Sequence, residues 1–166
     1  MNTIYNFLQE HNITYERFDH PAVFTCEQAN ELCPPMPGQS IKNLFLYDKR
    51  TEQHFLVVVP NGKRVDLKEL KNTLQVANLS FASEERLNKY LGVEPGSVTV
   101  LGLVNDTFHF VNVIFDAQLK NQALQCHPLI NTATLVMPFY TIEKFLNVTG
   151  HAYQFLEIPE RTNVTL

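Results

Sequence analysis

The sequence predicts an α+β fold, in which a single domain spans residues 1–166 and a mixed, mostly antiparallel sheet carries flanking helices. Segments with the apolar spacing of helices and segments with that of strands follow one another without the regular alternation of α/β proteins. The 166 residues are 45% hydrophobic and 18% charged, an ordinary globular balance that allows one packed core. No repeat, low-complexity stretch or linker divides the chain.

The first part of the chain is expected to start with an amphipathic helix, because Ile4, Phe7 and Leu8 share one helix face. The proline after His20 ends the strand that follows, and Thr25 begins a capping-box pattern for the next helix. A proline-rich loop then leads to two apolar strands joined by a polar connection. In chain order, we expect a helix over about 2–11, a strand over 13–18, a helix over 26–32, a loop over 33–38, and strands over 42–47 and 54–59.

In the remaining part of the chain, capping residues mark the helices. Asp66 lies near the start of one helix, Ser83 caps a second that ends before Gly92, and Pro138 opens a third that stops at Gly150. We expect these helices over 65–74, 84–91 and 138–148, and one helical turn over 117–121. Strands are expected over 78–81, 97–104, 108–115, 132–137 and 153–158, and the tail from about 159 is expected to fray.

Charge and composition exclude several classes of protein. The net charge of −4, from 13 basic and 17 acidic residues, argues against a protein that coats nucleic acid through many phosphate contacts, although a local basic patch could still meet one RNA end. No apolar run reaches the ~20 residues of a membrane helix, and the N-terminus lacks the pattern of a signal peptide. Three cysteines cannot all pair, and the CxxC and HExxH metal motifs are absent. We therefore expect a reduced, cytoplasmic protein without a metal or other cofactor.

Lys42 and Asn43 are the first candidates for chemistry, because they stand together at the start of an apolar strand. A buried amine needs a partner, water or a function. The more common explanation is an edge lysine whose amine reaches solvent, and a lone histidine such as His127, beside a proline, is more often structural. Cys126 and His127 are not expected to form a nucleophile and base, because neighbours on an extended chain point in opposite directions. Single residues therefore do not establish a function.

Five motifs taken together do resemble one family. In chain order they are Lys42-Asn43-Leu44-Phe45-Leu46, Phe55-Leu56-Val57-Val58-Val59-Pro60, Leu79-Ser80-Phe81-Ala82, Leu91-Gly92-Val93-Glu94-Pro95-Gly96-Ser97-Val98 and His127-Pro128-Leu129-Ile130-Asn131-Thr132-Ala133-Thr134. The chain thereby resembles the YbaK/ProX-type aminoacyl-tRNA deacylases, which are related to the insertion editing domain of bacterial prolyl-tRNA synthetases. It is most similar to the free-standing ProXp-ala (PrdX-type) proteins, which clear alanine from tRNA for proline. The resemblance extends from about Phe18 to Phe155.

The resemblance implies roles for individual residues of two motifs. Lys42 matches the lysine most closely tied to activity, and Asn43 beside it is expected to bind substrate. His127 matches a histidine that shapes the amino-acid pocket, and Asn131 lies in the same motif. Because a small acyl group must be selected by pocket volume, Cys126, His127 and Phe24 are the candidate wall residues of this pocket.

Further site residues come from two other segments. The glycine-rich turn from Gly96 to Gly102 would supply backbone groups around the ester and the terminal adenosine. Val100 stands where related proteins often have a proline, so this turn departs from the family pattern. Phe24 and Thr25 would lie near the pocket.

The implied reaction is hydrolysis of a mischarged aminoacyl-tRNA, with Ala-tRNA(Pro) as the first candidate. An aminoacyl ester is already reactive, so the site has to orient it and stabilise the oxyanion, without a metal or a strong nucleophile. Lys42 is expected to bind the terminal phosphate or the ester oxygen, and the ribose hydroxyl of the substrate helps to activate water. For this reaction Lys42 and His127 must meet across one cleft.

The expected partners are the acceptor end of a tRNA carrying a small amino acid and a prolyl-tRNA synthetase. Lys63, Arg64 and Lys68 are candidates for phosphate contacts, although basic loops are commonly just solvated. Two alternatives stay open: the same fold editing a tRNA that carries serine, cysteine or a larger residue, and a non-catalytic module that binds tRNA or a synthetase. The sequence does not indicate an oligomeric state.

Overall fold

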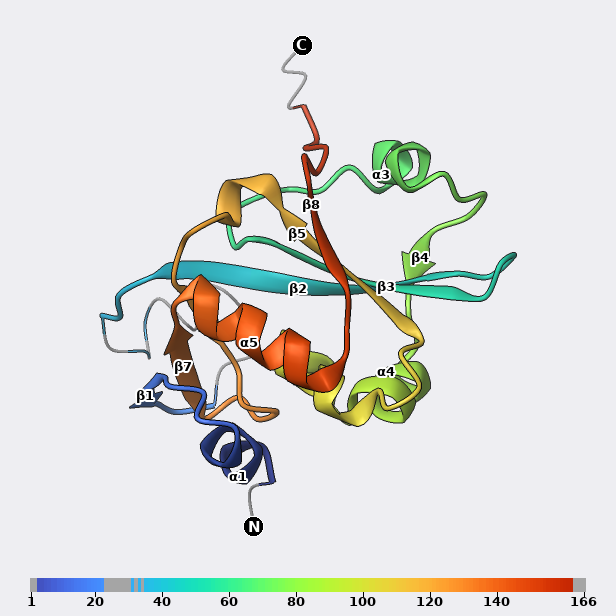
Figure 1. Ribbon diagram of the computed structural model, residues 1–166. Coiled ribbons are helices and arrows are strands. Elements are labelled where there is room, and N and C mark those ends of the chain that lie inside the picture. Colours follow the sequence, from blue (N-terminus) through green and yellow to red (C-terminus); the bar gives the residue numbers. More distant parts are fainter. Residues whose placement is uncertain (1–2, 23–30, 32, 34, 163–166) are drawn as a thin grey trace.

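Within the residues described by the computed structural model, which are 3–22, 31, 33 and 35–162, eight strands join in one mixed sheet (Figure 1). The strands are β1 (Glu16–Asp19), β2 (Gln39–Asp48), β3 (Gln53–Pro60), β4 (Ser80–Phe81), β5 (Val111–Asp116), β6 (Leu124–Cys126), β7 (Ala133–Met137) and β8 (Tyr153–Leu156). Their order in the sheet is β1-β7-β6-β2-β3-β5-β8, and β4 pairs with β2 outside this path. Four of the strand pairs are antiparallel and three are parallel, which confirms the mixed sheet.

The helices begin and end near the predicted capping residues. They are α1 (Thr3–Glu10), α3 (Leu67–Leu74), α4 (Glu84–Leu91) and α5 (Phe139–Thr149), with 3₁₀ turns η1 (Pro95–Ser97), η2 (Val100–Asn105) and η3 (Ala117–Leu119). The side chains of Asp66 and Ser83 accept backbone N–H groups at the starts of α3 and α4. Gly92 and Gly150 end α4 and α5 in the left-handed conformation, which glycine adopts without strain. None of the helices in this part of the chain has the length and apolar character needed to cross a bilayer.

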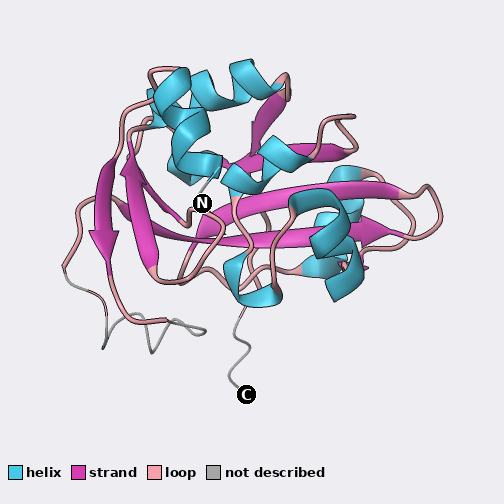
Figure 2. Ribbon diagram, turned by 90° about the horizontal axis from the view of Figure 1, so that it is seen from below, coloured by secondary structure: helices cyan, strands magenta, loops and turns pink. Residues whose placement is uncertain are grey.

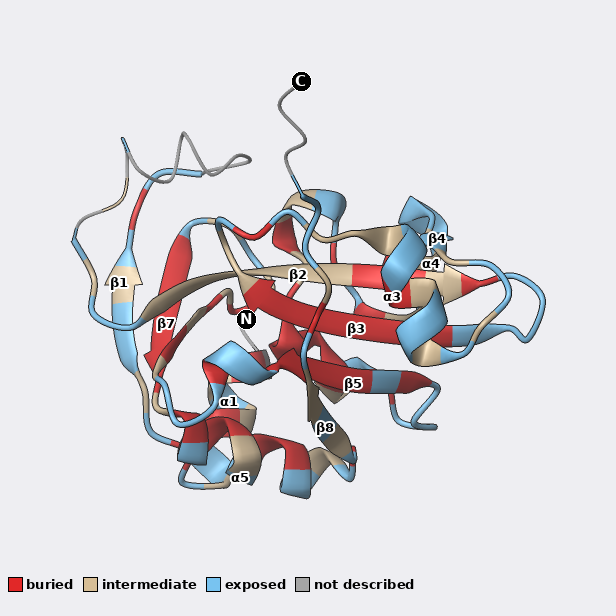
Figure 3. Ribbon diagram, turned by 90° about the horizontal axis from the view of Figure 1, so that it is seen from above, coloured by how far each residue is buried: buried red, intermediate tan, exposed pale blue. Residues whose placement is uncertain are grey.

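Helices cover both faces of the sheet (Figures 1 and 2). The larger core contains Ile4 of α1, Leu87 of α4 and Phe145 of α5, and the smaller core contains Leu70 of α3. Successive residues of β2 alternate between these cores, because side chains of a strand point to opposite faces. Figure 3 shows β3 and β5 buried along most of their length, whereas β1 lies at the margin of the sheet and is mostly exposed.

Strand β2 leaves part of one edge unpaired among the described residues. One edge pairs with β3 from Ile41 to Asp48. The other edge pairs with β6 at residues 39–40 and with β4 at residues 46–47. The stretch between these two contacts contains Lys42 and Asn43, so both candidate residues lie at an opening in the sheet.

Two predicted strands of the middle region are wrong in whole or in part. Residues 97–104 do not form a strand: η1 and η2 take their place, and Val100, Leu101 and Leu103 are all buried. A short apolar run does not distinguish a strand from a helical turn, so packing against α4 decided the outcome. The strand predicted over 108–115 starts only at Val111, because the Asp106 carboxylate accepts the N–H groups of Phe110 and Val111.

Three smaller differences separate the predicted elements from those in the structure. The strand β6 was not predicted, although it joins β7 to β2. The tail does not fray at residue 159: the Pro159 carbonyl accepts the Asp66 N–H, and the Arg161 N–H donates to the Arg64 carbonyl. The helix predicted over 26–32, with its Thr25 cap, lies outside the described residues except for residue 31, which is helical.

Candidate functional site

The register between β2 and β6 relates Lys42 to His127. The two strands are parallel, with Ser40 level with Gln125. The paired residues end there, and β6 itself ends at Cys126. Extended by two residues, the same register would match Lys42 with His127, and matched residues of neighbouring strands point to the same face. Ile41 and Cys126, one residue earlier on each strand, both pack in the larger core, so Lys42 and His127 project from the opposite face. The pairing therefore indicates that the two residues follow neighbouring strand segments on one side of the sheet, and their meeting across a cleft stays a prediction.

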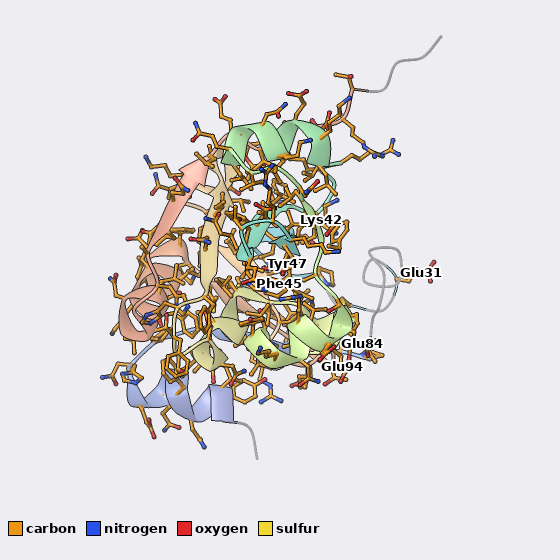
Figure 4. The ribbon with its side chains drawn as sticks, turned by 90° about the vertical axis from the view of Figure 1, so that its right-hand side faces the viewer. Glu31, Lys42, Phe45, Tyr47, Glu84 and Glu94 are labelled. Atoms are coloured by element: carbon orange, nitrogen blue, oxygen red, sulfur yellow. The ribbon has the colours of Figure 1, made fainter. Side chains whose placement is uncertain are left out.

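The Lys42 ammonium has no ionic partner among the described residues. The ion pairs found there are Arg17–Asp19, Lys63–Asp116 and His151–Asp106. Lys42 is half-buried on β2, where Phe45 and Tyr47 follow it along the strand (Figure 4). An ammonium that is half-buried and unpaired in this part of the chain can still receive an anion.

The surroundings of the His127 imidazole disfavour its protonated form. Burial lowers its pKa below the ordinary value, the nearby His20 ring lowers it further, and a hydrogen bond to the Ala133 backbone opposes both effects. The ring atom Nδ1 is buried and has no hydrogen-bond partner in the described part of the chain. A ring nitrogen without a partner in the described part of the chain can bind a polar group of a ligand.

Asn43 points to the other face of β2 and also has an unused atom. Its side-chain Oδ1 is one of four buried polar atoms without a partner among the described residues; the others are Tyr5 Oη, His54 Nδ1 and His127 Nδ1. Such atoms are uncommon in folded proteins, because burial without a hydrogen bond costs free energy. Two of the four belong to residues that the sequence analysis selected.

Cys126 is completely buried in the larger core. Burial raises the pKa of its thiol to about 12, so the thiol stays protonated and is no nucleophile. This agrees with the expectation that Cys126 and His127 form no catalytic pair. Its place in the wall of the amino-acid pocket stays a prediction.

The predicted glycine-rich turn consists of η1 and η2. Gly96 is half-buried in η1, and Gly102 is buried in η2. A Cβ atom at Gly102 would lie 3.0 Å from the Leu91 carbonyl oxygen, so the absence of a side chain lets η2 pack on α4. The side chain of Val100 is fully buried at the first position of η2, a position that also tolerates proline. Contacts of this turn with an ester stay a prediction.

The structure corrects the prediction that Lys63 is a solvated phosphate contact. Its ammonium is buried and lies 2.6 Å from the Asp116 carboxylate. Arg64 and Lys68 are exposed. Asn131 is half-buried in the loop after His127 and already has an interaction partner. Phe24 and Thr25 lie outside the described residues.

The loop that carries His127 holds a strained backbone. Leu129 has a φ of 70°, in the left-handed region that residues other than glycine seldom adopt. This conformation costs on the order of 1–2 kcal/mol, so neighbouring contacts must hold the loop in place.

His20, which no local sequence pattern marks as a site residue, lies near His127. His20 is 8% exposed, and its Nε2 atom lies 2.8 Å from the Thr134 hydroxyl oxygen. Its Nδ1 atom lies 2.9 Å from the Pro21 carbonyl oxygen. The sequence contained only a histidine before a proline and a threonine 114 residues later, so no local pattern could reveal the contact. Within the described residues, no three His, Cys, Asp or Glu side chains gather as metal ligands would.

Comparison with known proteins gives a family match and several relatives. Residues 20–145 match the family described as the aminoacyl-tRNA editing domain. Prolyl-tRNA editing protein ProX from Acetoanaerobium sticklandii is 36% identical over 152 residues, which cover 91% of this chain and 93% of that protein. Prolyl-tRNA synthetase associated domain-containing protein 1 from Danio rerio is 36% identical over 148 residues, 87% of this chain and 80% of that protein.

Solved structures share the fold. One described as "Crystal structure of a putative trans-editing enzyme for prolyl tRNA synthetase" superposes with a TM-score of 0.69 and covers 95% of each chain at 17% sequence identity. At this identity the likeness concerns the fold alone, and it agrees with the predicted α+β architecture.

Proposed function

This chain belongs to the aminoacyl-tRNA editing domain family and is an aminoacyl-tRNA deacylase, and we propose that it hydrolyses mischarged Ala-tRNA(Pro) in trans. The family match and the relative at 36% identity confirm the resemblance to ProX-type proteins. The names of the relatives contain prolyl-tRNA, which supports proline tRNA as the nucleic acid. Alanine as the acyl group follows from the resemblance of the His127 motif and the glycine-rich turn to the ProXp-ala branch.

The observation that supports this proposal is the parallel pairing of β2 with β6, which ends two residues before Lys42 on β2 and two residues before His127 after β6. In the proposed site Lys42 presents a cation, and His127 presents a buried ring nitrogen that has no partner among the described residues. The terminal nucleotide of an aminoacyl-tRNA offers matching groups, since its phosphate is an anion and its aminoacyl ester carries polar atoms close by. The arrangement supports ester binding without any nucleophilic side chain.

The proposed reaction is a hydrolysis assisted by the substrate. A water oxygen attacks the ester carbonyl carbon, the bond from this carbon to the ribose oxygen breaks, and the ribose oxygen takes a proton from the water. The ribose hydroxyl next to the ester helps to orient the attacking water. Lys42 binds the terminal phosphate or the ester oxygen and thereby fixes the geometry and offsets the developing negative charge.

Selectivity for a small acyl group requires a steric limit. One methylene group changes binding by only ~1–3 kcal/mol, so a pocket that rejects proline needs a wall as well as a good fit. His127, Cys126 and Phe24 are the proposed wall residues. The acceptor end of the tRNA and a prolyl-tRNA synthetase are the proposed partners, with Arg64 and Lys68 as proposed phosphate contacts.

A panel of misacylated tRNAs tests the proposal. The wild-type protein and the Lys42→Ala variant are assayed for deacylation of tRNAs that carry alanine, serine, cysteine or proline. We expect hydrolysis of Ala-tRNA(Pro) by the wild type and a much slower reaction by the variant. Faster hydrolysis of another ester would change the substrate, and binding without hydrolysis of any ester would favour the non-catalytic module.

A further inference from the structure

We propose that the main-chain groups of Asn43 hold the aminoacyl ester, by pairing with the acyl group as they would pair with one residue of a neighbouring strand. The Asn43 N–H donates to the ester carbonyl oxygen, and the Asn43 carbonyl accepts the α-ammonium group of the substrate. The inference rests on the proposed function and names the binding mode of its substrate. It follows from the hydrogen-bond pattern of β2, one edge of which is open at this residue.

The main-chain groups of β2 alternate between its two edges. β2 and β3 are antiparallel, and the Asn61 N–H donates to the Ser40 carbonyl at 2.9 Å. Bonded pairs alternate with non-bonded pairs in such a ladder, so the even-numbered residues of β2 direct their N–H and C=O groups toward β3. The main-chain groups of the odd-numbered residues, Asn43 among them, therefore point to the other edge.

Two hydrogen bonds on that other edge agree with this assignment. The Gln39 N–H donates to the Ala123 carbonyl at 2.8 Å, and the Phe45 carbonyl accepts the Ala82 N–H at 2.9 Å. Both of these β2 residues are odd-numbered, and both bonds leave the strand on the side away from β3. The same edge must then present the N–H and C=O groups of Asn43, which lies between them.

Asn43 stands in a short gap of this edge. The pairs of β2 with β6 end at Ser40, and its pairs with β4 begin at Leu46. Among the described residues, no strand pairs with the main-chain groups of Asn43 on this side. An open strand edge is a template for pairing with another chain. The strands on either side leave this opening too short for a further strand, so it suits a much smaller partner.

The side chain of Asn43 supplies one more acceptor. Its Oδ1 atom is buried and has no hydrogen-bond partner among the described residues. A buried acceptor without a hydrogen bond costs free energy, so the binding of a donor there is favoured. The main-chain carbonyl and Oδ1 belong to one residue, and an ammonium group has three N–H donors with which to meet both.

An aminoacyl ester carries the groups that complement this edge. Its acyl part is a single amino-acid residue, in which an ammonium group and a carbonyl group flank one Cα atom. Placed opposite Asn43, it exchanges two hydrogen bonds of about 2.9 Å, as a bonded pair of antiparallel residues does. When water attacks the ester, the carbonyl oxygen becomes negative, and the Asn43 N–H is already in place to stabilise it.

This pairing reads the part that all aminoacyl groups share. It distinguishes an aminoacyl ester from an ester that lacks the α-amine, because the second ester leaves the acceptors of Asn43 without a donor. Selection by size is left to the proposed wall of the pocket.

Amide hydrogen exchange of the ¹⁵N-labelled protein, followed by nuclear magnetic resonance, tests the open edge. We expect the Asn43 amide to exchange at least about tenfold faster than the amides of Lys42 and Leu44, which pair with β3 or lie beside its bonded residues. The comparison is internal, because the three residues are neighbours on one strand. An Asn43 amide as protected as that of Lys42 and Leu44 would overturn the proposal.

A non-hydrolysable analogue tests the pairing itself. The probe is 3′-amino-3′-deoxyadenosine acylated on its amine by alanine, which has an amide in place of the ester. At saturation we expect it to slow exchange at Asn43 at least about tenfold, and to bind at least about tenfold more tightly than the matching propionyl compound, which lacks the α-ammonium group. Binding that leaves Asn43 exchange unchanged, or equal affinity for the two compounds, would overturn the proposal.

Proline at position 43 removes the N–H group from the open edge. Asn43→Pro breaks no bond to β3, and Lys42 before it already has the extended backbone that proline requires. Asn43→Ala is the matched control, since it loses the same side chain and keeps the N–H. We expect kcat on Ala-tRNA(Pro) to be about 100-fold lower in Asn43→Pro than in Asn43→Ala, and equal rates would overturn the proposal. If Asn43→Pro does not fold, the exchange measurements on the wild type decide.

The outcomes separate this inference from the proposed function. A wild-type protein that neither binds the alanyl amide nor hydrolyses any aminoacyl-tRNA would refute the proposed function. A protein that hydrolyses Ala-tRNA(Pro) and binds the alanyl amide without protecting the Asn43 amide would refute this inference alone.

Discussion

Lys42 and Lys63 lie in two regions that differ in whether the lysine ammonium has an ionic partner. In the Lys63 region, formed by Lys63, Asp116 and Gln118, the ammonium lies 2.6 Å from the Asp116 carboxylate, whose other oxygen accepts the Gln118 N–H. The candidate residues Lys42, Asn43 and His127, which we call the Lys42 region although Asn43 faces the other side of β2, differ from this. The Lys42 ammonium has no ionic partner among the described residues, and the buried Asn43 Oδ1 and His127 Nδ1 atoms have no hydrogen bond there.

The difference indicates which residues stabilise the fold and which serve a ligand. A buried polar group with all its partners in place contributes to one defined structure, whereas an unpaired one lowers stability until something binds. Natural sequences retain such unpaired groups mainly at functional sites. Changes in the Lys63 region should therefore alter stability, and changes in the Lys42 region should alter activity.

The largest effect is expected from Lys63→Met. The Asp116 carboxylate would stay buried without its cation, which lowers the free energy of unfolding by about 3–5 kcal/mol. Urea denaturation followed by circular dichroism measures this change. The double variant Lys63→Met with Asp116→Leu should recover most of the loss, because no buried charge is then left alone. A loss below about 1 kcal/mol in the single variant would mean that the pair behaves like a solvent-exposed one.

Lys42→Ala should show the opposite pattern. We expect kcat/KM on Ala-tRNA(Pro) to fall about 100-fold, as for the loss of one group that stabilises an oxyanion, with the free energy of unfolding changed by no more than about 0.5 kcal/mol. Lys42→Arg, which keeps the charge, is the matched control and should retain part of the activity. Equal hydrolysis by the wild type and Lys42→Ala would remove Lys42 from the mechanism.

His54 tests whether an unpaired atom by itself marks a functional site. Its Nδ1 has no partner among the described residues, its Nε2 is 3.1 Å from Arg86, and burial followed by the Arg86 charge lowers its pKa to about 4. The unfolded chain binds this proton below about pH 6.5 and the folded protein only below about pH 4. The contribution of His54 to stability is therefore complete above pH 6.5 and is lost as the pH falls toward 4, by on the order of 2 kcal/mol.

Denaturation of the wild type and His54→Phe at several pH values measures this effect. We expect the difference in unfolding free energy between the two proteins to shift between pH 6.5 and 4 in favour of the variant, and deacylation to be unaffected. A large loss of deacylation in His54→Phe would extend the functional region to His54. A constant difference across this pH range would show that His54 titrates alike in the folded and unfolded states.

The smallest effect is expected from Gly102→Ala. A Cβ atom there would lie 3.0 Å from the Leu91 carbonyl oxygen, so η2 must shift and the free energy of unfolding falls by about 1–2 kcal/mol. Gly62→Ala is the matched control, because nothing lies within 4 Å of its Cβ position. If Gly102→Ala instead reduces deacylation strongly without changing stability, this glycine acts at the ester rather than in packing.

The sequence predicts best what depends on neighbouring residues. Asp66, Ser83, Gly92 and Gly150 mark helix ends in the structure, because a cap is formed by side chains and backbone groups of one segment. The family motifs are likewise short runs of residues. A short apolar run, such as residues 97–104, is compatible with both a strand and a helical turn. There the local pattern predicted a strand, whereas packing produced 3₁₀ turns.

The mixed α+β fold, the positions of the capped helices and the resemblance to editing deacylases were thus determined by the sequence itself. Only the tertiary structure decided that Lys63 is paired with Asp116, 53 residues away, and that His20 reaches Thr134, 114 residues away. It also decided that β6 pairs with β2 directly before Lys42 and His127, through the order in which the strands join the sheet. The physical reason is that a charge or a hydrogen bond finds its partner through the register of strands, which forms only when the whole sheet assembles.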